Sequence, residues 1–255
     1  MTTKDFSPIH ADYAFFEAHS TEAHADMEGY LPFLRRQLQT KATLHWLDFG
    51  CGSGNFTSQL FARLQASPEN LHISLVEPVA IYRQEARIRL QRFTAYTIDA
   101  WATLSRHAFQ SYDLALANHV LYYVPDLPGV VEQIIRSLKP SGRFLIAMAG
   151  SDNALAQIWT SSYPLLGKSL PYHTAEVLEK VLDRLPYPYH KQRIDYTVRF
   201  ADSEQNRLHM LNFMFADHFD ERHREQFLLL LDPYKEGDEI VIRSHHEQYQ
   251  VIPAR

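Results

Sequence analysis

The chain has 255 residues, of which 45% are hydrophobic and 22% are charged, so its composition predicts a globular protein whose core needs no disulfides. A single cysteine excludes a disulfide framework, and a formal net charge of −5 without a cluster of lysines and arginines argues against a nucleic-acid partner. No apolar run approaches the roughly 20 residues of a membrane span, and residues 1–6 lack the layout of a signal peptide. We therefore expect a cytoplasmic protein that acts on a small molecule, with no membrane partner.

The sequence predicts two cap-like helices within residues 9–40, followed by a core in which short apolar runs alternate with amphipathic stretches. This alternation is typical of a parallel sheet with right-handed crossovers. The expected fold class is α/β, a Rossmann-like, doubly wound, seven-stranded sheet with helices on both faces. The core strands are expected at 44–49, 71–76, 93–98, 112–117 and 143–149, with helices at 56–66, 79–91, 101–107 and 127–138.

The remainder of the chain predicts a helical insertion before the last strand of the sheet. We expect one domain over 1–255, made of an N-terminal cap (1–40), a ligand-binding core (41–150) and substrate-side helices and terminal strands (151–255). The later elements are expected as helices at 151–160, 174–184, 203–217 and 221–231, a strand at 190–200, and a terminal hairpin of 239–243 with 247–252.

The most informative motif is a strand that runs directly into a glycine turn at residues 47–56. Gly50, Gly52 and Gly54 let the backbone turn tightly and approach a ligand closely. A dinucleotide-binding loop would have its third glycine at position 55, which holds Asn55. With Asp48 two residues before the first glycine, the spacing resembles motif I of the class I S-adenosylmethionine-dependent methyltransferases. In this loop the small size of Cys51 is expected to matter more than its thiol.

The residues that follow the next strands extend this resemblance. Glu77 ends the second strand, where a carboxylate can accept hydrogen bonds from both hydroxyls of a ribose. After the third strand, the resemblance implies that Asp99 lies near the adenine amino group and that Trp101 stacks on the ring, although a helix cap and a packing role are the alternatives. The implied cofactor is S-adenosylmethionine, and its expected contacts are Asp48, Gly50, Cys51, Gly52, Gly54, Glu77, Asp99, Ala100, Trp101 and Asn118.

A second resemblance lies partly outside the core. The segments 19–22 (His-Ser-Thr-Glu) and 121–124 (Leu-Tyr-Tyr-Val), together with Trp159, resemble the histamine N-methyltransferase family. This implies that Glu22 contacts the substrate amine and that aromatic side chains wall the pocket. The implied substrate-binding residues are Tyr13, Phe16, Tyr122, Tyr123 and Trp159. The chain departs from the family pattern at His119 (glutamine in the family), Leu155 (tryptophan) and His245 (asparagine).

These residues suggest how a methyl acceptor is handled. A nitrogen must be uncharged to attack a methyl group, so His119 or His245 is expected to accept or relay its proton while Glu22 anchors an ammonium. Because neighbouring strand residues point to opposite faces, His245 and His246 cannot both face inward. No metal is expected, since no sequence-local pair of ligands is present.

We therefore expect transfer of a methyl group from S-adenosylmethionine to a nitrogen of a small amine or imidazole-like metabolite. The alternatives are O-methylation of a metabolite carboxylate or hydroxyl and a non-catalytic cofactor-binding protein. The oligomeric state is not predicted.

Overall fold

A computed structural model describes residues 7–105 and 108–253. Its centre is a sheet with the strand order β3-β2-β1-β4-β5-β8-β6, to which the two-residue β7 adds by pairing with β8. The first five strands in this order are parallel, whereas β8 runs antiparallel to both β5 and β6. The strands are β1 (Leu44–Phe49), β2 (Leu71–Val76), β3 (Asp99–Trp101), β4 (Tyr112–Asn118), β5 (Leu138–Met148), β6 (Tyr189–Ala201), β7 (Lys235–Glu236) and β8 (Glu239–Val251).

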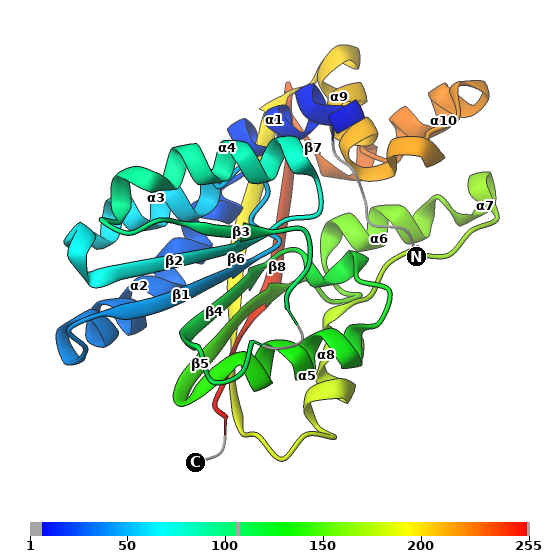
Figure 1. Cartoon of the computed structure of the whole chain (residues 1–255). Helices are drawn as coiled ribbons and strands as arrows, with labels where there is room; N and C mark the ends of the chain where they lie inside the picture. The colour runs from blue at the N-terminus through cyan, green and yellow to red at the C-terminus, as the bar shows by residue number, and fades with distance from the viewer. Residues whose placement is uncertain (1–6, 106–107, 254–255) are drawn as a thin grey trace.

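Helices cover both faces of this sheet, as expected for an α/β, doubly wound fold. Figure 1 shows α3 and α4 on one side of the strands and α5 with α8 on the other. The prediction of a Rossmann-like sheet of seven main strands is confirmed. The α-helices are α1 (His10–His19), α2 (Glu22–Thr40), α3 (Asn55–Leu64), α4 (Ala80–Leu90), α5 (Leu127–Ser137), α6 (Ala154–Ser161), α7 (Tyr163–Leu166), α8 (Ala175–Leu182), α9 (Glu204–Phe215) and α10 (Arg224–Leu229).

The central strands form because their residues suit burial on both faces of a sheet. The six residues from Tyr112 to Ala117 are all buried, as is typical of a parallel strand between two helical layers. On one face, α2, α3 and α4 pack around Trp46, which has no exposed surface. On the other face, α5 and α8 pack on β4 and β5.

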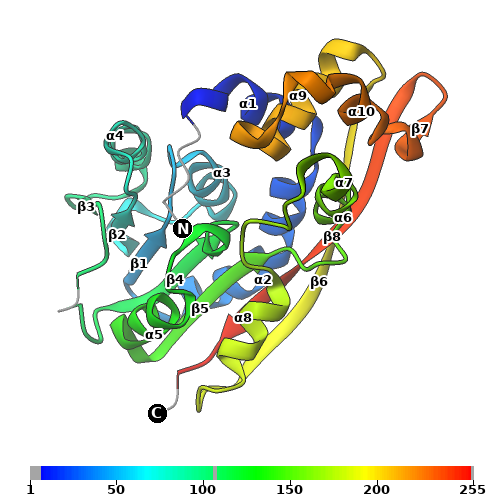
Figure 2. The same cartoon turned by 90° about the vertical axis from the view of Figure 1, so that its right-hand side faces the viewer.

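A third apolar cluster lies away from the parallel strands and joins the two ends of the chain. It includes Phe16 of α1, Trp159 of α6 and Phe215 of α9, packed on the far parts of β6 and β8. Figure 2 shows α1, α9 and α10 gathered at the end of these two long strands. Among the described residues, no helix has both the length and the apolarity that crossing a membrane requires.

The third strand differs from its prediction. It begins at Asp99, where it pairs with Ser74, rather than at residue 93. The preceding segment, although rich in aromatic and β-branched residues, is held by other bonds, such as the one that the Thr94 hydroxyl donates to the carbonyl of Leu71 at 2.5 Å. Because Trp101 still belongs to the strand, the helix predicted at 101–107 is wrong for 101–105, and 106–107 lie outside the described residues.

The predicted terminal hairpin is also wrong. Residues 239–251 form one continuous strand, β8, which pairs with β6 along its whole length. The polar residues at its middle suggested a turn between two strands, but Ser244, His246 and Gln248 are buried polar residues on one face of an unbroken strand.

Candidate active site

A cavity of about 730 Å³ opens beyond the carboxyl ends of β1, β2 and β4, where a doubly wound fold places its ligands. Helices α1, α2 and α6 close its other sides with side chains that include Tyr13, Glu22 and Trp159. The volume is within the range of roughly 300–1,000 Å³ that small-molecule and cofactor sites occupy. This cavity is the candidate active site.

The glycine loop forms one end of the cavity. The N–H groups of Gly50 and Cys51 donate to the carbonyl of Val76, at 2.7 and 3.2 Å, which ties the loop to the end of β2. Gly50, Gly52 and Gly54 all have positive φ, at 74°, 53° and 75°. A Cβ added to Gly52 would meet nothing within 4 Å. The loop therefore presents bare backbone to open space, which fits a ligand that must approach the main chain closely.

Glu77 is fixed beside this loop. Its carboxylate accepts the N–H of Gly52 at 3.0 Å and that of Val79 at 2.9 Å, and it lines the cavity. A carboxylate held in one orientation at a cavity wall is a suitable acceptor for the two hydroxyls of a ribose. The loop and Glu77 together fit a nucleoside-bearing cofactor.

Asp48 lies beneath the loop instead of lining the cavity. It is buried and accepts a 2.5 Å hydrogen bond from the hydroxyl of Thr57 in the first turn of α3. Burial raises its pKa to about 7, the Thr57 bond opposes this shift, and the charge of Glu77 adds to it. The structure thus places Asp48 where it connects the end of β1 to the start of α3.

The cofactor-side residues expected after the third strand are displaced by the later start of β3. Asp99, Ala100 and Trp101 are the strand itself and do not line the cavity, and Trp101 is 37% exposed. Residues 102–104, which follow the strand, line the cavity in their place. Gly54 packs against Ala86 of α4 and does not line it either. Of the expected cofactor contacts, those that line the cavity are Gly50, Cys51, Gly52, Glu77 and Asn118.

The same cavity is lined by a buried carboxylate, Asp26, that the sequence analysis did not identify. Asp26 has no exposed surface and accepts hydrogen bonds from four side chains. Burial raises the pKa of its carboxyl, but the charges and hydrogen bonds of two histidines outweigh this effect and hold the pKa far below its ordinary value. The donors are His119 Nε2 (3.0 Å), His246 Nε2 (2.6 Å), Gln248 Nε2 (2.7 Å) and Asn118 Nδ2 (3.2 Å).

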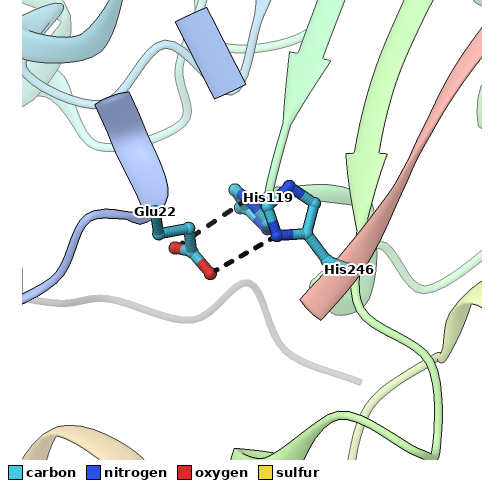
Figure 3. Close-up of side chains that lie close together, drawn as sticks. All are labelled: Glu22, His119 and His246. Carbon is cyan, nitrogen blue, oxygen red and sulfur yellow. Dashed lines mark ion pairs between the residues drawn. The ribbon is translucent and has the colours of Figure 1, made fainter. Parts of the chain in front are cut away.

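Glu22 faces the same two histidines from the first turn of α2, one helical turn before Asp26. Its Oε2 lies 3.8 Å from His119 Nε2, and its Oε1 lies 3.9 Å from His246 Nδ1. Figure 3 shows the glutamate pointing toward both rings. We call Glu22, Asp26, His119 and His246 the acceptor-end cluster. It brings together α2, the residue after β4, and β8.

His119 has an unusual backbone conformation. Its φ is +53°, in the left-handed region that residues other than glycine seldom adopt and that is enriched at functional sites. Its ring lies between Asp26 on Nε2 and the hydroxyl of Tyr122, 3.0 Å from Nδ1. Burial alone lowers the pKa of His119, but the carboxylates of Glu22 and Asp26 raise it to about 9.

The five expected substrate-binding aromatics all line the cavity. Two of them are tied to their neighbours, since Phe16 stacks on Phe213 at 4.2 Å and the hydroxyl of Tyr122 accepts the N–H of Ala149 at 2.6 Å. Leu155, at the position where the histamine N-methyltransferase family has a second tryptophan, also lines it. Further aromatic rings that the sequence analysis missed include Tyr172, Tyr196 and Phe213.

The structure places His245 and His246 on opposite sides of β8, and the one that faces the cluster is His246. His245 does not line the cavity, and its Nε2 bonds the carboxylate of Asp152 at 3.0 Å. His246, rather than the predicted His245, is therefore the histidine of β8 that lies beside Glu22 and Asp26. One sequence signal could have identified Asp26, because it lies four residues after Glu22 and so shares a helix face with it.

Comparisons with known proteins agree with this geometry. A family described as "Methyltransferase domain" matches residues 22–189. The chain is 25% identical over 239 residues to histamine N-methyltransferase B of Xenopus laevis, covering 82% of this chain and 80% of that protein. It is 29% identical over 140 residues, 54% of this chain and 48% of the other, to trans-aconitate 2-methyltransferase of Rhizobium meliloti (strain 1021).

Among solved structures, the fold is similar to that of the YcgJ protein of Bacillus subtilis. The TM-score is 0.61 at 14% sequence identity, and the likeness covers 89% of this chain and 99% of that one. At this identity the likeness shows the shared fold alone.

Proposed function

We propose that this chain, which belongs to the methyltransferase-domain family and is a class I enzyme dependent on S-adenosylmethionine, methylates a nitrogen of a small amine or imidazole-like metabolite. The cofactor, when bound, supplies a methyl group on a positively charged sulfur. The residues suited to hold it are those of the glycine loop and Glu77. The proposal concerns the acceptor and the atom that is methylated.

The observation that carries the proposal is the acceptor-end cluster, of which Glu22, Asp26 and His119 line the same cavity as the glycine loop. Glu22 and Asp26 provide two carboxylates there, and within the described part of the chain their ion pairs are with His119 and His246. Such a surface favours a cationic or hydrogen-bond-donating group. A basic metabolite fits this surface if its ammonium lies near Glu22 and a second nitrogen is directed toward the methyl group.

Orientation is the main contribution of the protein to this reaction. Methyl transfer is an in-line displacement, and holding nucleophile and methyl carbon near contact in one geometry contributes up to roughly 7–11 kcal/mol. Glu22 anchors one end of the acceptor, and the aromatic rings of Tyr122, Tyr123 and Trp159 limit its freedom. Aromatic faces also attract cations, by about 0.5–2 kcal/mol each.

The test is incubation with S-adenosylmethionine that carries a labelled methyl group, against a panel of small amines, imidazoles and carboxylates. We expect label on nitrogen. Glu22→Gln is expected to lower kcat/KM for amines roughly 10–150-fold, because a hydrogen bond to a charged group contributes about 1.5–3 kcal/mol. Affinity for S-adenosylmethionine, measured by calorimetry, is expected to be unchanged.

Glu28→Gln is the matched control, since Glu28 is an exposed residue of the same helix that pairs with Arg63. It is expected to leave amine methylation unchanged. Equal activity of Glu22→Gln and Glu28→Gln on amines would contradict the proposal.

The similarity to trans-aconitate 2-methyltransferase supports a second candidate, O-methylation of a carboxylate. Such an acceptor would meet the like charge of Glu22 and Asp26. Under this alternative, Glu22→Gln would raise rather than lower the rate of label transfer, because it removes one repulsive charge.

A further inference from the structure

One nitrogen of the acceptor-end cluster lies near Glu22 but makes no hydrogen bond within the described residues. His246 has no exposed surface, and its Nδ1 is a buried nitrogen without a hydrogen-bond partner within the described residues. Its other nitrogen, Nε2, donates to Asp26 at 2.6 Å. In the neutral ring, this bond fixes the proton on Nε2 and leaves a lone pair on Nδ1. That lone pair points toward Glu22.

Two electron-pair donors therefore face each other across a gap. Glu22 Oε1 and His246 Nδ1 are 3.9 Å apart, too far for a hydrogen bond between them. The second oxygen of Glu22 lies at a similar distance, 3.8 Å, from His119 Nε2. A transition-metal ion bound at about 2.0–2.2 Å from each ligand atom would fit such a separation with only small side-chain movements.

We propose that Glu22, His119 and His246 form a binding site for a divalent transition-metal ion of the zinc class. Two imidazole nitrogens and one carboxylate oxygen are a ligand set that zinc accepts, with a fourth position left open. These three side chains are the group of potential metal ligands that the described residues bring within 4.8 Å of one another. They come from positions far apart in the chain, so the absence of a sequence-local ligand pair does not argue against the site.

The surroundings of the three ligands match those of a metal site. Metal-bound histidines usually donate their second N–H to a carboxylate, carbonyl or similar acceptor, which fixes the ring. Asp26 occupies this place for His246. For His119 the hydroxyl of Tyr122, 3.0 Å from Nδ1, does so, while Nε2 becomes a ligand when the ion displaces the proton that it donates to Asp26 at 3.0 Å. Once the ion has displaced the proton of His119, both histidines are neutral and the two carboxylates of the cluster balance the charge of a divalent ion.

The cavity gives the ion a path to the site and implies an effect on methyl transfer. Glu22 and His119 line the cavity, so an ion can reach them from there. An ion on Glu22 would exclude an acceptor's ammonium from that carboxylate. If the acceptor bound as a neutral amine, coordination would occupy the lone pair that must attack the methyl group. In both cases the ion inhibits N-methylation.

The first experiment is titration of the purified full-length protein with zinc chloride alone, followed by calorimetry and by competition with a chromophoric chelator. We expect one ion per chain. Glu22→Gln and His246→Gln are expected to weaken binding by at least the roughly 10–100-fold that loss of an outer partner of a metal ligand causes. Circular dichroism checks that each variant is folded, and Glu22, at the cavity wall, gives a usable variant even if His246→Gln is unstable.

The matched control is His245→Gln, which changes the neighbouring histidine on the opposite side of β8. This side chain pairs with Asp152, and its replacement is expected to leave zinc affinity unchanged. A crystal soaked in zinc should show anomalous density among Glu22, His119 and His246.

Three results would overturn the inference. They are no binding below millimolar zinc, equal weakening by His245→Gln and His246→Gln, or density only at another histidine pair such as His45 and His72, whose rings stack at 4.4 Å. The outcome is separable from that of the proposed function. If the protein methylates amines but binds no zinc, the proposed metal site is wrong and the proposed function stands. If it binds zinc but methylates no amine in the absence of zinc, the proposed class of methyl acceptor is wrong and the metal site stands.

Discussion

Asp48 is a buried carboxyl group whose pKa, raised to about 7, makes stability depend on pH. Between about pH 4 and pH 7 the native chain holds a proton that the unfolded chain has released, so the free energy of unfolding falls as pH rises. The full effect is on the order of 4 kcal/mol. Asp48→Asn is expected to remove it, so that the variant gains stability relative to the wild type from pH 4 to pH 8, as measured by denaturant unfolding.

Asp113 is the control, because its shift has the opposite sign. Burial raises the pKa of Asp113, but Lys139 and Lys41, at 2.7 and 2.6 Å, outweigh this and lower it. Its contribution to stability is therefore present at neutral pH and lost in acid. Asp113→Asn should cost more stability at pH 7 than near pH 3, and the same slope for both variants would contradict the two assignments.

Gly50 and Gly52 both have positive φ but differ in their surroundings. A Cβ at Gly50 would lie 2.1 Å from a methyl carbon of Val120, whereas one at Gly52 would enter open space. Gly52→Ala is expected to cost roughly 1–2 kcal/mol of stability from backbone strain. Gly50→Ala should cost about 1–3 kcal/mol more from overpacking. Thermal unfolding of both variants tests this order, and equal losses would contradict it.

Sequence patterns identified the residues whose role depends on local chain geometry. The glycine spacing and Glu77 at a strand end are visible in short segments, and the structure places both at the cavity. Asp26 and His246 are buried polar residues whose meaning comes from partners on distant strands. The spacing of Asp26 from Glu22 indicates a shared helix face, but the local sequence does not show that this face is buried against His119 and His246.

Helix α6, which carries Trp159 to the cavity, depends on the side chain of Asn153 at its start. The Oδ1 of Asn153 accepts the N–H groups of Leu155 and Ala156, while its Nδ2 donates to the hydroxyl of Tyr196 and the carbonyl of His245. Asn153→Ala removes the cap and two buried anchors. We expect a loss of roughly 2–4 kcal/mol in the free energy of unfolding.

The N-cap of α5 provides a comparison with fewer bonds. Asp126 is exposed and accepts the N–H of Gly129 at 3.0 Å. Asp126→Ala is expected to cost only about 1 kcal/mol, the usual value of a helix cap. Denaturant unfolding of the two variants should therefore separate a cap alone from a cap that also joins α6 to β6 and β8.

Elements with regular burial were predicted well, and elements at the sheet edge or within the site were not. β4 is buried at six consecutive residues, and β1 and β2 are buried at most of their positions, so all three strands are mainly apolar. β3 is three residues long, and its neighbours have the composition of a strand without its pairing. In β8, the polar residues that bond Asp26 and the N–H of Ala154 interrupt the apolar pattern, which is why one strand was mistaken for a hairpin.

Across the whole molecule, the glycine loop and the acceptor-end cluster are built from different parts of the chain and should respond separately to substitution. His119→Ala is expected to lower turnover on the order of 10-fold or more while leaving affinity for S-adenosylmethionine unchanged, because it removes a contact at the acceptor end. Gly52→Asp should abolish cofactor binding, since it adds bulk and a negative charge beside Glu77. Calorimetry and single-turnover rates distinguish the two, and an equal loss of both quantities in His119→Ala would assign that residue to the scaffold.

At this scale the sequence predicted the class of the fold, the cofactor and the approximate position of the site. It did not predict the acceptor-end cluster as a unit, because the hydrogen bond between His246 and Asp26 joins residues 220 positions apart. Local periodicity carries no information about which distant strands become neighbours.

The position of β8 between β5 and β6 has a consequence for how the enzyme comes into being. On the ribosome, every residue of the glycine loop and Glu77 is synthesised long before the strand that delivers His246. Because β8 pairs with both β5 and β6, the sheet and the acceptor-end cluster are complete only after this last strand has been made.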